Sequence, residues 1–252
     1  MSDVIPTGTT LDSEFLFERM TAETLGATRA APGKRVLDVA SGFGQDAIAL
    51  MEETGAEVHG AEPSERMMAW TRLKSAEADS AVPVWTRAWS DALPFSDDVF
   101  DASFCKGAID HFDRPLLAIG EMARVTKPDG RVVLAIANFD SLSCRTARWA
   151  DGVREGLLGQ EVARGRRHYD VPADHFTRYE LGLMREQAAH HIVVEDVIGI
   201  SLAWGIPVWT RSVGHLPVPV VERVLRFLDA TARRLPGLAD VIVLAGRPRA
   251  RA

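Results

Sequence analysis

The stretch between residues 36 and 46 contains the residue types that hold an adenosine-containing cofactor. An apolar, strand-like run carries one acid, Asp38, and glycines follow at positions 42 and 44 before a helical pattern begins. Such a turn lets a ligand approach the backbone closely, because no Cβ stands in the way. Gly42, Gly44 and Ala47 also fit the Gly-x-Gly-x-x-Ala fingerprint of nicotinamide and flavin enzymes. Alone, the stretch indicates a cofactor loop without choosing the cofactor.

A second acid, Glu62, follows the next apolar run, 24 positions beyond Asp38. A carboxylate at that place points at the crevice above the strand ends and can accept hydrogen bonds from both hydroxyls of a ribose. Such charge-assisted bonds contribute roughly 1.5–3 kcal/mol each. The alternative interpretation is a solvated acid that caps the next helix. A ribose-binding acid suits any adenosine cofactor, so the choice stays open.

Two further motifs narrow the choice. Residues 90–95 read Ser-Asp-Ala-Leu-Pro-Phe and precede an apolar run, and residues 127–130 read Lys-Pro-Asp-Gly. With these motifs in order behind the glycine loop and Glu62, residues 35–138 closely resemble the class I S-adenosylmethionine-dependent methyltransferases. The resemblance is to the small-molecule group related to quinone-biosynthesis methyltransferases. The ending at residues 238–244 also resembles that family's last strand.

The resemblance implies that S-adenosyl-L-methionine is the cofactor and gives binding roles to a set of residues. They are Asp38, Ala40, Ser41, Gly42, Gly44, Glu62, Pro63, Asp91, Ala92 and Lys106. The loop around Gly42 and Gly44 would pack against the methionyl part of the cofactor, and Asp38 would orient that loop. Lys106 would present its backbone carbonyl to the cofactor's amino group.

The same resemblance implies the adenosine contacts. Glu62 would bind the ribose, and Pro63 would flank the adenine. Asp91 would accept a hydrogen bond from the exocyclic amine, with the backbone of Ala92 at the ring edge.

The chain departs from the family pattern at two places. Ala40 stands where the family more often has glycine, and residues 128–130 read Pro-Asp-Gly instead of Pro-Gly-Gly. An alanine costs little if its φ is negative, and an aspartate tolerates a left-handed turn conformation. We expect neither departure to prevent cofactor binding.

Charge supports the same cofactor independently of the resemblance. Dinucleotides bring a pyrophosphate, which a helix N-terminus attracts. Asp38 and Asp46 would repel a pyrophosphate at this loop, whereas they suit a ligand that carries a sulfonium and an ammonium.

Candidates for the acceptor site lie outside the cofactor motifs. His111 follows the run that ends at residue 105 and either takes a proton from the acceptor or packs as a structural histidine. His175 and Tyr179 could line a polar pocket or hold a cap together, and Trp204 could form an apolar wall or pack in the core. Arginines at 164, 166 and 167 either contact an anionic acceptor or form a solvated face. No cluster of cysteine and histidine indicates a metal site.

Composition limits the classes of function. The 252 residues carry a net charge of −6, which argues against nucleic acid or an anionic membrane as the main partner. The two cysteines make a disulfide framework improbable and fit a reducing compartment. The first residues lack a signal-peptide pattern, and no run has the length of a transmembrane helix. We therefore expect a cytoplasmic protein.

The pattern of elements predicts the fold. Apolar runs predict strands at 35–40, 57–61, 84–88, 100–105, 131–137, 192–202 and 240–245, separated by helices at 45–54, 63–75, 115–125 and 219–235. This is an α/β chain with a doubly wound, mostly parallel, seven-stranded sheet, an antiparallel last strand and a helical cap. We expect one methyltransferase domain over residues 1–252, made of an N-terminal helix (1–34), a cofactor-binding core (35–138), a cap (139–190) and C-terminal strands and a helix (191–252).

The function predicted from these features is methyl transfer to a small-molecule acceptor, at oxygen in preference to nitrogen or carbon, with release of S-adenosylhomocysteine. One alternative is a protein with the same fold and cofactor that catalyses hydroxylation, decarboxylation or cyclisation instead of methyl transfer, because a fold alone does not determine the reaction. Another is a cofactor-binding, non-catalytic partner subunit, and nicotinamide-dependent reduction is the most distant. A homodimer is a further expectation.

Overall fold

The computed structural model describes residues 10–76, 82–159, 169–170, 172, 175–206, 209, 213 and 215–250. The chain divides into two compact units. Unit 1 comprises Met1–Met20, Ala137–Leu181 and Ile198–Ile242, and unit 2 comprises Thr21–Ile136, Gly182–Val197 and Val243–Ala252. None of the helices within the described residues is long and apolar enough to cross a membrane.

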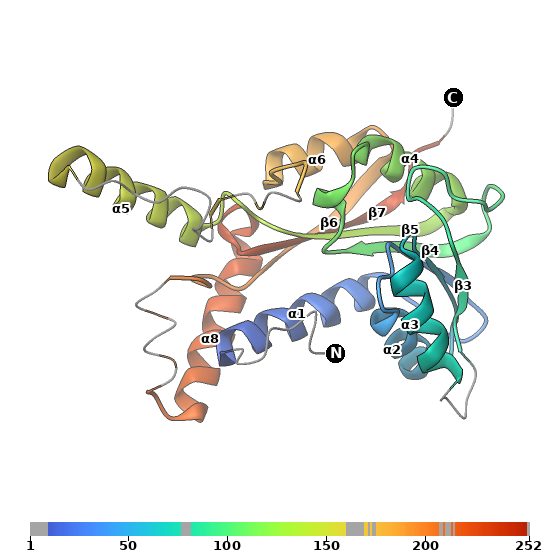
Figure 1. The fold of residues 1–252 in the computed structure, drawn as a ribbon, viewed down its shortest axis with the longest axis horizontal. Helices are drawn as coiled ribbons and strands as arrows, with labels where there is room; N and C mark the ends of the chain where they lie inside the picture. The colour runs from blue at the N-terminus through green and yellow to red at the C-terminus, as the bar shows by residue number, and fades with distance from the viewer. Residues whose placement is uncertain are drawn as a thin grey trace. The chain divides into compact units, whose positions relative to one another are not determined.

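A seven-stranded sheet in the order β3-β2-β1-β4-β5-β7-β6 forms the centre of the fold (Figure 1). The strands are β1 (Arg35–Val39), β2 (Glu57–Ala61), β3 (Val84–Thr86), β4 (Phe100–Lys106), β5 (Thr126–Ala137), β6 (Ile192–Ile200) and β7 (Val241–Pro248). The sheet is mostly parallel and its last strand, β7, is antiparallel. The predicted fold class is therefore confirmed.

The central strands are apolar on both faces, as expected for parallel strands covered by helices. In β1, Val36, Leu37 and Val39 have no exposed surface. Asp38 of β1 is aligned with Gly60 of β2 on one side and with Phe104 of β4 on the other. This register brings the carboxyl ends of three neighbouring strands to one edge of the sheet, where α/β proteins bind ligands.

Helices cover both faces of the sheet in unit 2. Figure 1 shows α2 (Gln45–Thr54) and α3 (Glu65–Ala76) on one side of the sheet, with α4 (Pro115–Val125) and α6 (Leu181–Ala189) on the other. The predicted helix at 45–54 ends where expected, because Gly55 adopts the left-handed conformation (φ 68°) of a C-cap. Pro115 begins α4, where its missing N–H costs nothing.

The start of β5 differs from the prediction. A turn at residues 128–130 was expected before a strand from Arg131, but β5 begins at Thr126. Phe100 pairs with Thr126 whereas Ala102 pairs with Arg131, so residues 127–130 bulge out of the ladder. A Cβ at Gly130 would lie 2.6 Å from the Asp101 carbonyl oxygen, which explains the glycine within the bulge.

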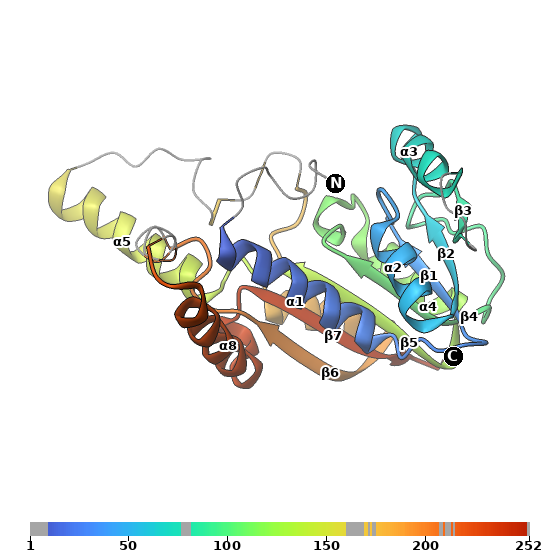
Figure 2. The ribbon, with the colours of Figure 1, turned by 90° about the horizontal axis from the view of Figure 1, so that it is seen from below.

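Unit 1 contains the first part of α1 (Leu11–Ala27) together with α5 (Leu142–Leu158), α8 (Val218–Arg234) and the short helix η2 (Pro236–Leu238). The first part of α1 and α8 lie side by side (Figures 1 and 2). Their contact is an apolar cluster made by Leu11, Phe15, Trp209, Val213, Val221 and Leu225. At its edge the Arg19 guanidinium pairs with Asp229 at 3.1 Å.

Asp240 is a buried acid that joins several segments of unit 1. Its carboxylate accepts hydrogen bonds from the Ser143 hydroxyl at 2.7 Å and from the Trp204 backbone N–H at 3.0 Å. Burial raises the pKa of Asp240 to about 6, although these hydrogen bonds act in the opposite direction. The Asp240 backbone carbonyl also accepts from the N–H of Asn138, the residue after β5.

Candidate functional site

The glycine loop connects β1 to α2, and every second residue from position 40 to position 44 has a left-handed backbone conformation. Ala40, Gly42 and Gly44 have φ values of 58°, 53° and 73°. We expected alanine at position 40 to cost little stability if its φ were negative. Its φ is positive, so this condition is not met. A left-handed conformation costs an alanine roughly 1–2 kcal/mol because its Cβ approaches the carbonyl oxygen.

The two glycines of the loop have different surroundings. A Cβ added at Gly42 would meet no atom of the described residues within 4 Å, so among these residues the backbone there borders open space. A Cβ at Gly44 would lie 2.4 Å from the Trp85 ring and 2.7 Å from Thr71. Gly44 is therefore required by packing inside the protein, whereas Gly42 leaves room for a ligand.

Asp38 lies buried beside the loop with a second acid and a lysine. Lys106 donates from Nζ to Asp46 Oδ1 at 2.7 Å, and the ammonium also lies close enough to Asp38 to lower its pKa. Burial and the Asp46 charge outweigh that effect, so the pKa of Asp38 is well above its usual value. The Oδ2 atom of Asp38 has no partner among the described residues.

Glu62 holds the loop as well as the start of the next helix. Its Oε2 accepts from the Gly42 N–H and its Oε1 accepts from the Ser64 N–H, both at 2.9 Å. The residue is 7% exposed. A carboxylate has about four acceptor sites, so each oxygen keeps one lone pair for a ligand hydroxyl.

Asp91 faces the same region from the segment after β3. Its Oδ2 lies 2.5 Å from Nη2 of Arg114, whose side chain is 66% exposed. Ala92 donates from its backbone N–H to the Trp89 carbonyl, which closes a turn around Asp91. The Asp91–Arg114 pair was not predicted, because the two residues are distant in sequence and nothing in the motif marks the arginine.

A cavity of about 280 Å³ brings several predicted residues together within unit 2. It is lined by Ala40, Glu62, Pro63, Trp89, Ser90, Asp91, Ala108, His111, Phe112, Asp113 and Arg114. The volume is near the lower end of the roughly 300–1,000 Å³ typical of small-molecule sites. Glu62, Pro63 and Asp91, which were predicted at the adenosine end, line this cavity, whereas Ala92 does not. Asp38, Gly42 and Lys106, predicted at the methionyl end, do not line it either.

Trp89 is the main residue of the lining that the sequence interpretation missed. Its side chain lies at the cavity although the residue is 69% exposed. The available signal was its place directly before the Ser90-Asp91 motif, since small-molecule sites are lined predominantly by hydrophobic and aromatic side chains.

The unpartnered polar atoms fit an adenosyl cofactor with a positively charged tail. Asp38 Oδ2, Ser41 Oγ and Gln45 Nε2 are all buried and lack a partner among the described residues. Buried polar atoms normally have partners, so such a group near a glycine loop indicates a ligand. The acids Asp38 and Asp46 disfavour a pyrophosphate and favour a cation.

His111 belongs to the short helix η1 (Ile109–His111) directly after β4. It lines the cavity, and its side chain is 40% exposed. Its Nε2 lies 3.9 Å from the Asp110 carboxylate. The position allows contact with a ligand, but whether His111 acts as a base stays a prediction.

The predicted acceptor-binding residues lie in unit 1, His175 and Tyr179 within the predicted cap and Trp204 after β6. His175 packs edge-on against Phe139 with ring centroids 6.3 Å apart. Tyr179 has no exposed surface, and its carbonyl accepts from the Phe139 N–H. Trp204 donates from its indole nitrogen to the Ser13 hydroxyl at 3.0 Å. Their roles toward an acceptor stay predictions.

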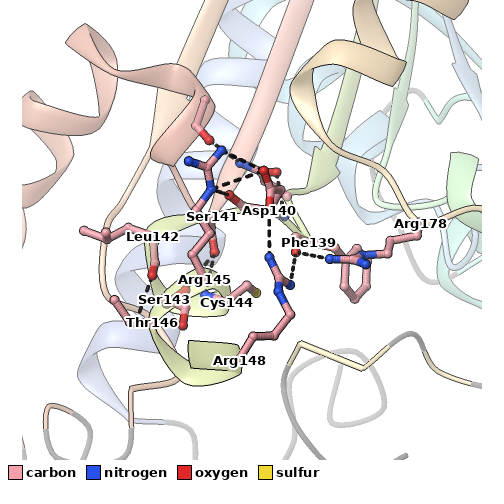
Figure 3. A network of polar contacts seen from close by, with 12 residues as sticks. Phe139, Asp140, Ser141, Leu142, Ser143, Cys144, Arg145, Thr146, Arg148 and Arg178 are labelled. Carbon is pink, nitrogen blue, oxygen red and sulfur yellow. Dashed lines mark hydrogen bonds and ion pairs between the residues drawn. The ribbon is translucent and has the colours of Figure 1, made fainter. Parts of the chain in front are cut away.

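An arginine network surrounds Phe139 and Asp140 in the same unit (Figure 3). Arg148 donates to the Phe139 carbonyl at 2.8 Å and to the Asp140 carboxylate at 2.7 Å, and Arg178 donates to the same carbonyl at 3.2 Å. The arginines proposed from the sequence, at 164, 166 and 167, lie outside the described residues.

Comparisons with known proteins agree with this geometry. Residues 37–134 match the family model described as a methyltransferase domain. Methyltransferase GfsG of Streptomyces halstedii is 31% identical over 159 residues, which cover 61% of this chain and 54% of the relative. A demethylmenaquinone methyltransferase of Thermus thermophilus is 41% identical over 109 residues, or 43% of this chain and 49% of the relative. The chain spans about half the length of the curated relatives it matches.

A solved structure supports the fold across a longer range. A chain of the complex between the Haloferax volcanii Trm112 methyltransferase activator and a putative methyltransferase is similar with a TM-score of 0.63. The match covers 95% of this chain and 92% of the other at 20% identity, so it shows the fold alone. The family model and the relatives together show that residues 37–134 are similar to methyltransferase domains.

Proposed function

We propose that this protein transfers a methyl group from S-adenosyl-L-methionine to a small-molecule acceptor, at oxygen in preference to nitrogen or carbon, and releases S-adenosylhomocysteine. The observation that carries the proposal is the cavity at the carboxyl end of the strands, in which Glu62 and Asp91 face the same space. Two carboxylates so placed can hold ribose hydroxyls and an exocyclic amine at once.

The residues of the chain have distinct parts in this proposal. Glu62 holds the ribose and fixes the Gly42 backbone, while Asp91 accepts from the adenine amine with Ala92 at the ring edge. Pro63 lies in the cavity wall beside the adenine. When bound, S-adenosyl-L-methionine supplies a methyl carbon that its sulfonium already activates.

Catalysis by the protein then consists mainly of alignment and exclusion of water, because the methyl donor is already activated. Holding the two reactants in line is worth about 7–11 kcal/mol. His111 lies in the cavity wall and accepts the proton of an acceptor hydroxyl in this proposal. An acceptor that is ionised at neutral pH needs no such base.

Calorimetry tests the cofactor assignment. The protein should bind S-adenosylmethionine and S-adenosylhomocysteine, and NADH should not bind. Binding of NADH without either adenosyl ligand would reject the proposal. Label from methyl-labelled cofactor should then appear in a product of an acceptor screen. Turnover that leaves the label in the cofactor indicates a non-methylating reaction, and binding without any turnover indicates a non-catalytic subunit.

A further inference from the structure

The side chain of Lys106 is held at a fixed place beside the glycine loop. Lys106 is the last residue of β4, and its Nζ donates to Asp46 Oδ1 at 2.7 Å and to Thr21 Oγ1 at 2.6 Å. These partners belong to α2 and to the part of α1 that lies in unit 2. The side chain is 21% exposed, so the ammonium is partly desolvated. The sequence interpretation assigned a role only to its backbone carbonyl.

The hydrogen-bond inventory of this ammonium is incomplete. A lysine ammonium has three N–H donors and no acceptor. Asp46 and Thr21 take two of these donors, and no further acceptor for Nζ occurs among the described residues. One donor therefore remains for a ligand at a position that the other two bonds define.

The charges around Lys106 limit what that ligand group can be. Asp38, Asp46 and Glu62 provide three carboxyl groups at the loop, and Lys106 is the cation that lowers the pKa of Asp38. The cofactor of the proposed function carries a sulfonium, an ammonium and one carboxylate. An ammonium repels the first two groups and attracts only the carboxylate.

We propose that Lys106 Nζ binds the α-carboxylate of the cofactor's methionyl group. The inference rests on the proposed function and adds to it a positioning residue at the methionyl end, beyond the cavity that Glu62 and Asp91 line. The α-carbon of the methionyl group carries both the carboxylate and the ammonium. The carboxylate would contact Lys106 Nζ, and the ammonium would contact the Lys106 backbone carbonyl, as predicted from the sequence. One residue then recognises both halves of the amino acid.

The test compares ligands that differ in the carboxylate alone. Affinities are measured by calorimetry for S-adenosylhomocysteine and for its decarboxylated analogue, which keeps the ammonium. In the wild-type protein the analogue should bind about 10- to 100-fold more weakly, as expected for loss of one charge-assisted hydrogen bond. Lys106→Met should lower the affinity for S-adenosylhomocysteine by the same factor and leave the affinity for the analogue unchanged. Lys106→Arg should retain part of the affinity that Lys106→Met loses.

Lys127→Met is the matched control, because Lys127 also pairs with a carboxylate, Asp101 Oδ1 at 2.9 Å, at the other end of β4. It should leave both affinities unchanged. The comparison of the two ligands on wild-type protein requires no variant, so it can overturn the inference even if Lys106→Met does not fold. In that case Lys106→Arg, which keeps the charge but moves the donors, should change the affinity for S-adenosylhomocysteine and not that for the analogue, and an unchanged ratio of the two affinities overturns the role of Lys106. Equal wild-type affinities for the two ligands overturn the inference while the proposed function stands. Absence of binding by S-adenosylmethionine and S-adenosylhomocysteine overturns both.

S-adenosylmethionine gives a further readout. Lys106→Met should lower the affinity for S-adenosylmethionine about as much as the affinity for S-adenosylhomocysteine, because both ligands carry the carboxylate. If the variant instead binds S-adenosylmethionine more tightly and S-adenosylhomocysteine unchanged, the ammonium acts only by repelling the sulfonium, and the inference is wrong.

Discussion

The Glu62 carboxylate accepts a hydrogen bond from the backbone N–H of Gly42 at 2.9 Å. The acid that we expect to hold the cofactor's ribose therefore also fixes the loop that faces the methionyl end. Its second oxygen accepts from the Ser64 N–H, so α3 is tied to the same group. Ligand affinity and loop geometry are coupled through one side chain.

Glu62→Gln is expected to weaken S-adenosylhomocysteine binding by about 10- to 100-fold, because an amide nitrogen replaces one acceptor and the remaining bonds lose their charge. Calorimetry measures the change. Glu65→Gln is the matched control, since the Glu65 side chain is 82% exposed and lies 3.7 Å from Arg87. Equal affinities of wild type and Glu62→Gln would contradict the ribose assignment.

Ala40→Gly is expected to raise the free energy of unfolding by roughly 0.5–1 kcal/mol. The left-handed φ of 58° costs alanine about 1–2 kcal/mol, and the greater entropy of glycine in the unfolded chain returns about 0.5–1 kcal/mol of this. Urea titration measures the difference. Gly42→Ala, at φ 53°, should have the opposite sign. A destabilised Ala40→Gly would show that the loop carries no strain at this residue.

Asp240 should make the protein less stable as pH rises from about 4 to 6. Its pKa is about 6 in the folded state, raised by burial from 3.8. Between these values the folded state keeps a proton that the unfolded state has lost, so stability falls by about 1.4 kcal/mol per pH unit and by at most about 3 kcal/mol in total. The stabilising contribution is complete below pH 4 and absent above pH 6.

Asp240→Asn tests this dependence, because the amide cannot ionise while its oxygen still accepts one hydrogen bond. Free energies of unfolding of the two proteins, measured by urea titration at several pH values, should converge or cross over this range. Parallel curves for the two proteins would mean that Asp240 titrates at the same pH in both states.

His111→Ala should lower kcat by about 10²- to 10⁴-fold if the histidine takes the acceptor's proton. Affinity for S-adenosylhomocysteine should stay near that of the wild type, since this ligand has no acceptor proton to transfer. Steady-state rates across roughly pH 6–9 give the readout. Full turnover by the variant over this range excludes a base and leaves His111 as part of the cavity wall.

The sequence predicted the sheet and most helices closely, because alternating apolar runs and helix caps are local signals. The helices at 45–54 and 115–125 and the strand at 57–61 have the predicted bounds. The start of β5 was missed because pairing with β4, which is a non-local contact, decides where the ladder begins. The helical cap assigned to residues 139–190 and the single domain stay predictions.

The site was less predictable than the fold, because its side chains are placed by contacts between distant segments. The left-handed φ of Ala40 is not indicated by alanine itself, which usually avoids this conformation, and only the glycine that the family more often has at this position pointed to it. Lys106 acquires its position from α1 and α2, and Asp91 acquires Arg114 as a partner from the segment before α4. We predicted that the missing side chain of Gly44 leaves room for a ligand, but the Trp85 ring occupies the space in which a Cβ would lie.

The order β5-β7-β6 has a consequence for how the chain acquires its structure during synthesis. β6 is the edge strand and its neighbour is β7, so residues 192–200 have no sheet partner until residues 241–248 are available. Meanwhile β5 presents an open edge with unpaired N–H and C=O groups, which is a template for association with other chains. Truncation before residue 241 removes β7 and leaves both β5 and β6 without this partner. We therefore expect the truncated protein to aggregate.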